Sequence, residues 1–95
     1  MAAYVIAQIE ITDPQTFEDY RRQVPPTLAP YGGRFIVRGG ASETLEGTWQ
    51  PTRLVVIEFP DRATAKAWWS SQDYAGPKAL RQRSARGELI VIDGV

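Results

Sequence analysis

The side chains that could do chemistry in this chain are arginines, tyrosines, tryptophans and carboxylates, because histidine and cysteine are both absent. Without them, the usual zinc sites and the Ser-His-Asp and Cys-His nucleophile systems are excluded. Haem would lack its usual His or Cys axial ligand. No phosphate-binding loop is present either, since Gly32-Gly33 and Gly39-Gly40 lack the required spacing and lysine. We therefore expect no metal and no other cofactor.

Three residues, Arg38, Trp68 and Tyr74, are the candidates for a ligand site. Tryptophan and tyrosine supply the apolar walls that ligand pockets usually have, and arginine supplies a fixed positive charge. Such a site would take a small, mostly flat, weakly acidic organic molecule. The alternative is that Trp68 and Tyr74 only fill the core of a small domain, with Arg38 on the surface or at an interface. No residue is assigned a catalytic role.

Four strands are predicted to hold these residues in place, over 4–11, 34–38, 53–59 and 89–92. The third has apolar side chains on both faces, which indicates a central strand covered above and below. The connection from Gly39 to Thr52 is long, because hairpin loops usually have about 2–5 residues. It contains either a bent strand extension or a segment that reaches over a neighbouring surface. Its Trp49 could serve as a lid or anchor the loop to a partner subunit.

Helices are predicted between the strands. The first opens at Asp13-Pro14, where aspartate suits the N-cap and proline the first helical position. It is expected to break or kink at Pro25-Pro26. The second begins after Asp61, which again suits an N-cap. A last helical stretch runs from Tyr74 to about Ala85 and is closed by Gly87.

The order βαββαβ predicts a four-stranded antiparallel sheet in spatial order 4-1-3-2, with the helices on one face. This is the ferredoxin-like plait, formed here by one domain over residues 1–95. The other face would expose much apolar surface, which is rare on a monomer. We therefore expect a homodimer that pairs through the open sheet face. That face carries Tyr4, Ile6, Ile36, Leu54, Val56 and either Leu89 and Val91 or Ile90 and Ile92.

The strand register decides where the charged residues lie. Suppose that the odd-numbered residues of the second and third strands face the helices. Arg34 then lies opposite Glu58, most simply as a structural ion pair, and Arg38 lies opposite Leu54 on the open face. Trp68 lies on the helix side, so Arg38 could join it only if the pocket opens at the edge of the sheet.

The charge balance and hydropathy bear on partners and location. The 11 basic residues match the 11 acidic ones, so no global field attracts nucleic acid or an anionic membrane. The basic run from Lys78 to Arg86 complements a helix C-terminus instead. No segment approaches the roughly 20 apolar residues of a membrane helix. We expect a soluble cytoplasmic protein with no nucleic-acid or membrane partner.

A set of short motifs covers nearly the whole chain: Val24-Pro25-Pro26-Thr27, Tyr31-Gly32-Gly33-Arg34-Phe35, Val37-Arg38-Gly39-Gly40, Leu45-Glu46-Gly47, Val56-Ile57-Glu58-Phe59-Pro60, Ala67-Trp68, Ser71 and Tyr74, and Arg81 six residues before Gly87. These motifs resemble the domain-of-unknown-function family thirteen-thirty. The resemblance implies the dimeric α/β-barrel superfamily, whose members include cofactor-free monooxygenases, lactone isomerases and haem enzymes. Pro30 and the tandem Trp68-Trp69 depart from the family's usual pattern.

Two classes of function follow. The first is a small-molecule pocket in each subunit of the dimer, as in a cofactor-free oxygenase or isomerase. The alternative is a non-catalytic dimeric binding or structural module. Without histidine, the first class lacks the most adaptable acid–base group near neutral pH. We favour the small-molecule site, whether or not it is catalytic.

Overall fold

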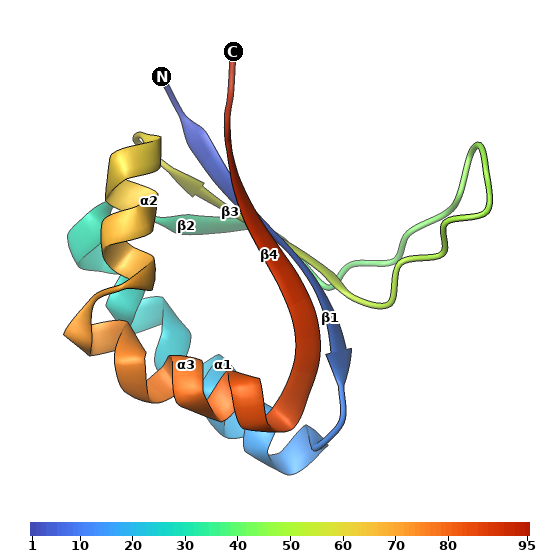
Figure 1. Cartoon of the computed structure of the whole chain (residues 1–95), viewed down its shortest axis with the longest axis horizontal. Helices are drawn as coiled ribbons and strands as arrows, with labels where there is room; N and C mark the ends of the chain where they lie inside the picture. Colours follow the sequence, from blue (N-terminus) through green and yellow to red (C-terminus); the bar gives the residue numbers. More distant parts are fainter.

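The computed structural model describes all residues from 1 to 95. Four strands, three helices and one 3₁₀ turn follow one another along the chain (Figure 1). They are β1 (Ala3–Ile11), α1 (Pro14–Leu28), η1 (Ala29–Tyr31), β2 (Arg34–Arg38), β3 (Leu54–Phe59), α2 (Arg62–Trp69), α3 (Gln72–Ser84) and β4 (Ala85–Asp93).

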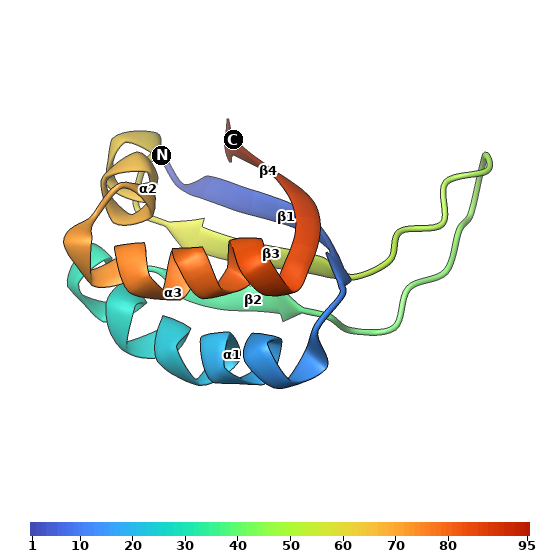
Figure 2. The same ribbon diagram turned by 60° about the horizontal axis from the view of Figure 1, so that its bottom comes forward.

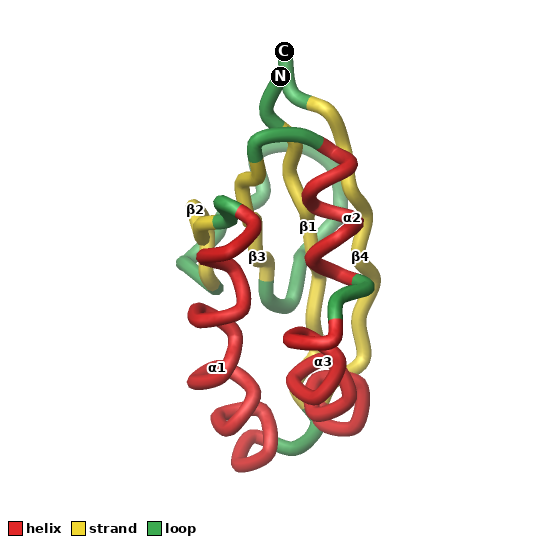
Figure 3. The backbone as a smooth tube through the Cα atoms, turned by 90° about the vertical axis from the view of Figure 1, so that its left-hand side faces the viewer, coloured by secondary structure: helices red, strands yellow, loops and turns green.

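The strands form one antiparallel sheet in the order β2-β3-β1-β4, as predicted. All helices lie on one face of this sheet (Figure 3). No helix covers the other face, which is called the open face below. Figure 2 shows α1 and α3 running side by side, and the two helices pack against each other. The arrangement is the predicted ferredoxin-like plait.

The core lies between the sheet and the helices. Alternate residues of β1 and β3 are buried there, because strand side chains point to opposite faces in turn. Both predicted aspartate caps are present: the Asp13 carboxylate accepts from the Thr16 N–H at 3.3 Å, and Asp61 accepts from the Thr64 N–H at 2.7 Å. The larger core side chains are Ile9, Phe17, Tyr20, Leu28, Ile57, Phe59, Trp68 and Tyr74.

The first helix was predicted to break or kink at Pro25-Pro26; it continues to Leu28, so a break there is wrong. Local packing supports the continuation. The Thr27 hydroxyl donates to the Val24 carbonyl at 2.7 Å and accepts from the Trp68 indole at 3.0 Å. The turn that contains the prolines is therefore held to α2 from outside the helix.

The last helix and strand begin earlier than predicted. Ser71 is the N-cap of α3, where its hydroxyl accepts from the Tyr74 N–H at 3.2 Å. The strand β4 starts at Ala85, and Gly87 lies within it rather than closing a helix. Gly87 faces Ile9 across the sheet, and a Cβ there would come within 2.7 Å of the Gln8 carbonyl oxygen. The glycine is required by this close approach of two strands and not by a helix end.

The open face carries the predicted apolar side chains, and it takes Ile90 and Ile92 from β4, which are 58% and 49% exposed. Residues 39–53, called the long loop below, contain no strand, and the middle of the loop projects away from the body (Figure 1). The two ends of the chain lie together, since the Gly94 N–H donates to the Ala2 carbonyl at 2.8 Å. No helix has the length and apolar character needed to cross a membrane.

Candidate functional site

A small cavity between the helices and the sheet brings together the three candidate ligand residues. Arg38 from β2, Trp68 from α2 and Tyr74 from α3 all line it. Its volume is about 30 Å³, which is room for about one water molecule. That the cavity binds an organic ligand stays a prediction. In this conformation such a ligand has to displace side chains on entry.

A β-bulge in β2 turns Arg38 toward the cavity. The register shifts between Phe35 and Val37, so that Val37 lies opposite Val56 and Arg38 lies opposite Val55. Because Val55 is buried on the helix side, Arg38 also lies on that side. The predicted register, with Arg38 on the open face and Val37 toward the helices, is therefore wrong. Arg38 and Trp68 therefore lie on the same side of the sheet and can border one site.

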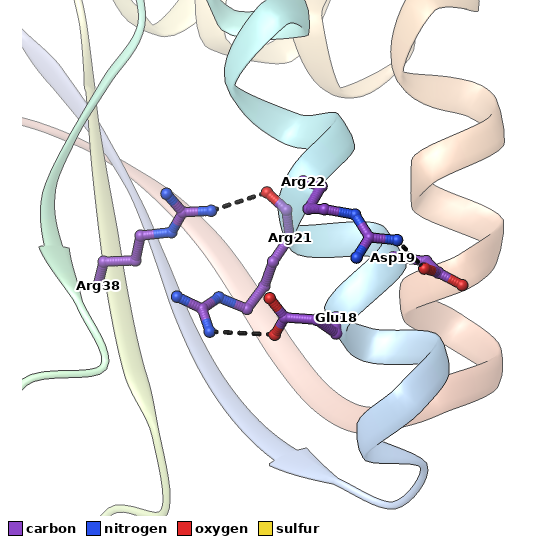
Figure 4. Close-up of polar contacts among 5 residues, drawn as sticks. All are labelled: Glu18, Asp19, Arg21, Arg22 and Arg38. Carbon is purple, nitrogen blue, oxygen red and sulfur yellow. Dashed lines mark hydrogen bonds and ion pairs between the residues drawn. The ribbon is translucent and has the colours of Figure 1, made fainter.

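The proline pair in α1 gives Arg38 its hydrogen-bond partner. Pro25 has no N–H, so the carbonyl of Arg21, four residues earlier, lacks its helical donor. The Arg38 guanidinium replaces that donor, with Nη2 at 2.9 Å from the Arg21 oxygen (Figure 4). The same guanidinium lies 4.2 Å from the centroid of the Phe35 ring. Arg38 thus bridges β2 and α1 beside the cavity.

The wall of the cavity is a chain of aromatic rings. Trp68 and Tyr74 are fully buried, with ring centroids 4.0 Å apart. The Tyr74 hydroxyl lies 3.0 Å from the Tyr20 hydroxyl of α1. Two hydroxyls share only one hydrogen in such a contact, so the other hydrogen remains available for a further acceptor. The indole N–H of Trp68 is already used by Thr27.

Tyr20 cannot act as a base near neutral pH. Burial is the main cause that raises the pKa of its hydroxyl far above the usual value, and the neighbouring Tyr74 adds to the effect. The positive charges of Arg81 and Arg38 oppose that increase only in part. Tyr20 therefore stays protonated, and the hydrogen that the two hydroxyls do not share can be donated into the cavity.

Arg81 is a cavity residue that the sequence analysis missed. It lies on α3, is only 6% exposed, lines the cavity, and its Nε has no hydrogen-bond partner. None of the ion pairs includes it. The buried residues of α3 are Tyr74, Pro77, Arg81 and Ser84. This helical spacing could have shown that Arg81 belongs to the inward stripe and not to the solvated basic run.

Two more arginines lie at the cavity and were also missed. Arg21 and Arg53 both line it, and each has a buried Nε without a partner. Burial lowers the pKa of Arg53, and the nearby charges of Arg21 and Arg38 lower it further. The Arg53 guanidinium also occupies the space beside Gly39, where a Cβ would collide with it. The sequence holds no local signal for this convergence, because the long loop separates Arg38 from Arg53.

On the open face, the predicted pair is present. Arg34 Nη2 lies 2.7 Å from Glu58 Oε1, and the Tyr4 hydroxyl donates to Glu58 at 3.4 Å. The carboxylate is therefore satisfied by a cation and a hydroxyl from the two neighbouring strands. This confirms the interpretation of Glu58 and Arg34 as a structural ion pair.

A larger apolar groove of about 470 Å³ lies between α2 and β4. Its volume falls in the range of ligand pockets, but its only charged lining residue is Lys66. Apart from the indole N–H of Trp69, only the Lys66 and Ser70 side chains are available there to orient a ligand. The smaller cavity is therefore the better candidate for specific chemistry, because it combines aromatic walls with several cations.

The remaining residues of interest lie elsewhere. Trp49 donates through its indole nitrogen to Gln8 Oε1 at 2.8 Å. Gln8 belongs to the open face of β1, so Trp49 does not cover the cavity as a lid in this conformation. No group of three or more His, Cys, Asp or Glu side chains is arranged to hold a metal ion.

Solved structures with low sequence identity share this fold. A protein of unknown function from Rhodopseudomonas palustris aligns with a TM-score of 0.78 at 16% identity, over 99% of this chain and 82% of that chain. A dimeric ferredoxin-like protein of unknown function from Jannaschia gives 0.76 at 12%, over 99% and 100%. A cofactor-independent oxygenase from Streptomyces nogalater gives 0.69 at 11%, over 99% and 93%.

No curated protein matches the sequence. A family model does match it, over residues 2–95, and its description is a domain of unknown function, DUF1330. The match covers nearly the whole chain and agrees with the motifs on both halves of it. The chain therefore belongs to the DUF1330 family.

Proposed function

We propose that the protein is a homodimer with one small-molecule site in each subunit, bordered by Arg38, Trp68 and Tyr74. The observation that carries the proposal is the convergence of these three side chains, from β2, α2 and α3, on one cavity. Two are aromatic and fully buried, and the third is a cation that bridges two elements. The ligand is a small, mostly flat organic molecule that packs against the rings.

The dimer pairs through the open sheet face. Ile36, Val37, Ile90 and Ile92 lie on this face and are each at least 40% exposed. A second copy of the same sheet would cover them by an isologous contact. A solved neighbour from Bacteroides fragilis is described as dimeric with a ferredoxin-like fold, as is the one from Jannaschia. The site needs no metal or haem in this proposal.

Two solved structures named as oxygenases share the fold of this chain. The oxygenase from Streptomyces nogalater shares the fold, and so does a putative antibiotic biosynthesis monooxygenase from Nitrosomonas europaea. A fold alone does not select a reaction. The proposal is therefore for binding, with a cofactor-independent oxygenase or isomerase as the enzyme class to be assayed.

One observation favours the alternative, a dimeric module without a ligand. The cavity of about 30 Å³ is much smaller than a typical ligand pocket. In that case Trp68 and Tyr74 are only core residues. The two functions differ in whether a ligand can open the cavity.

A ligand panel tests this difference. Purified protein is titrated with small phenols, quinones and carboxylates, and binding is followed by thermal shift and by tryptophan fluorescence. The fluorescence is read in a Trp49→Phe and Trp69→Phe background, where Trp68 is the single reporter. A ligand that binds the folded state raises the melting temperature, and Tyr74→Phe changes its affinity. If no compound binds, or if hits ignore both Tyr74→Phe and Arg38→Ala, the module without a ligand is the correct function.

A further inference from the structure

We infer that the ligand of this cavity is an aromatic carboxylate and that Arg81 receives its carboxylate group. The inference rests on the proposed function; it narrows the weakly acidic ligand expected from the sequence to a carboxylate and adds the residue that binds it and its orientation. It comes from the set of four arginines at the cavity, of which three were not predicted as site residues.

The charges around the cavity do not balance. Arg21, Arg38, Arg53 and Arg81 line it, and no aspartate or glutamate does. Among these four arginines, only Arg21 has an ion-pair partner, Glu18, at 3.3 Å (Figure 4). The second carboxylate in that view, Asp19, pairs with the exposed Arg22 and faces away. Buried charges in proteins are usually paired, so this excess of cations indicates a missing anion.

Several donors at the cavity have no acceptor. Nε of Arg21, Arg53 and Arg81 has no partner in each case. The Tyr20 and Tyr74 hydroxyls leave one hydrogen unused between them. Guanidinium groups have no acceptor atoms, and Tyr20 stays protonated. A ligand that satisfies this site must therefore bring acceptor oxygens, and a carboxylate matches the planar fork of an arginine.

Arg81 is the deepest of the four cations. It is 6% exposed, whereas Arg38 is exposed enough to contact solvent. Leaving such a cation buried and unpaired is costly, and a bound carboxylate removes the cost. The aromatic part of the ligand lies against Trp68 and Tyr74, whose rings form the adjoining wall. This arrangement places the charge inward and the ring beside the aromatic pair.

Entry of the ligand depends on Arg38. With its Nη2 on the Arg21 carbonyl, the cavity has room for about one water molecule. An aromatic carboxylate enters when Arg38 leaves that carbonyl. The Arg38 guanidinium then loses a neutral acceptor, whereas Arg81 gains a charged one, and hydrogen bonds to charged acceptors are stronger. Opening is thus compensated by binding of the anion.

The experiment compares each acid with its neutral amide. Benzoate, cinnamate and naphthoate are titrated as sodium salts against the corresponding amides, with sodium chloride and sodium sulfate at equal ionic strength as controls. We expect at least one acid to raise the melting temperature saturably, with no matching shift from its amide or from either salt. A shift from sulfate equal to that from the acids would mean that the site binds inorganic anions instead and would overturn the inference.

Variants locate the charge. Arg81→Met should weaken the acid by at least about tenfold, because a charge-assisted hydrogen bond is lost. Without ligand, the same variant should melt at or above the wild-type temperature, since an unpaired buried cation is removed. Arg83→Met, at an exposed position of the same helix, is the matched control and should leave the affinity unchanged. Arg81→Lys keeps the charge without the fork, so it tests the site even if Arg81→Met does not fold.

The outcomes separate this inference from the proposed function. Equal binding of acids and amides, or retention of acid affinity in both Arg81 variants, would overturn the carboxylate and leave the small-molecule site intact. Binding of neutral panel compounds alone would have the same meaning. Failure of every acid, amide and panel compound to bind would overturn both.

Discussion

The two faces of the sheet differ in whether their cations have carboxylate partners. On the open face each strand-borne cation has a carboxylate: Arg34 lies 2.7 Å from Glu58, and Arg86 lies 3.4 Å from Glu10. On the helix-covered face, Arg53 and Arg81 have none. The exposed face, where water could solvate a charge, is balanced within the chain. The buried face, where an unpaired charge is costly, is not.

This difference distinguishes charges that stabilise the fold from those that we propose for ligand binding. An ion pair that is complete within the chain needs no further partner, as Glu58 and Arg34 show. A buried cation without a carboxylate is retained at a cost in stability, which is common at binding and catalytic sites. The same reasoning applies to the apolar residues: those beneath the helices already have partners, whereas those on the open face have none within the chain, which is why we propose a dimer.

The largest expected effect is on the helix-covered face. Trp68→Ala should lower the free energy of unfolding by about 3–5 kcal/mol, because it removes a fully buried ring and leaves a cavity. Its neighbour provides the control: Trp69 is 44% exposed and contacts Lys78 through its ring face. Trp69→Ala should cost about 0.5–1 kcal/mol. Urea unfolding measures both, and equal losses would show that burial does not distinguish the two positions.

On the open face, the prediction concerns assembly. Light scattering at micromolar concentration should give about twice the chain mass of 10.6 kDa. Val56→Asp should weaken the dimer by about 3 kcal/mol, because it buries an unpaired charge between the two sheets. Gln82→Asp, on the exposed surface of α3, adds the same charge and should leave the dimer intact. A wild-type monomer, or a Val56→Asp variant with unchanged mass, would show that the open face is not the interface.

A smaller effect tests the bridge between the two elements beside the cavity. Arg38→Ala should cost about 1 kcal/mol, since the Arg21 carbonyl then loses its donor. In a Pro25→Ala background the helix supplies an N–H to that carbonyl, so the cost of Arg38→Ala should fall. A double-mutant cycle of thermal or urea unfolding measures this coupling. Strict additivity of the two substitutions would mean that proline and arginine act independently.

The smallest expected effect is the loss of stability that protonation of the Asp13 and Asp61 helix caps causes at acid pH. Hydrogen bonds from Thr16 and Thr64 hold the pKa of the Asp13 and Asp61 carboxyls below the usual value. Their stabilisation is therefore present above the unfolded pKa of about 3.9 and is lost as the pH falls through the lower folded pKa.

Replacing both cap residues with asparagine keeps a capping side chain and removes the titration. We expect the Asp13→Asn and Asp61→Asn double variant to lose less stability on acidification than the wild type. Urea unfolding at a series of pH values below about 5 measures the difference. An unchanged slope would assign the acid sensitivity to other groups. Any loss of carboxylate binding in acid is best measured in this background.

Much of the fold could be predicted because its signals are local. Alternating apolar residues predicted the strands and their two faces, and Asp13 and Asp61 predicted the helix starts. The pairing of Arg34 with Glu58 followed from antiparallel register near the start of β2. These features depend on side-chain periodicity and on capping chemistry, which neighbouring residues show directly.

The site could be predicted only in part, because its geometry depends on distant compensation. The residue types of Phe35-Ile36-Val37 do not predict the bulge that turns Arg38 inward. The continuation of α1 through Pro25 depends on a donor from β2, thirteen residues further along the chain. Arg81 was grouped with a basic run although its helical spacing places it inside. Where tertiary contacts override local preference, function is most often involved.

The meeting of the two chain ends has a practical consequence. Because Gly94 and Ala2 are hydrogen-bonded, a short glycine-rich linker can join them without crossing the sheet, and new ends can be opened in the long loop. Such a circular permutant keeps every strand pairing, since the loop contains none. In the permutant, β3 becomes the first strand and β2 the last, so their pairing joins the two ends of the new chain. In the unpermuted chain, the ends at Ala2 and Gly94 can each carry a fusion tag, and the two tags would lie side by side.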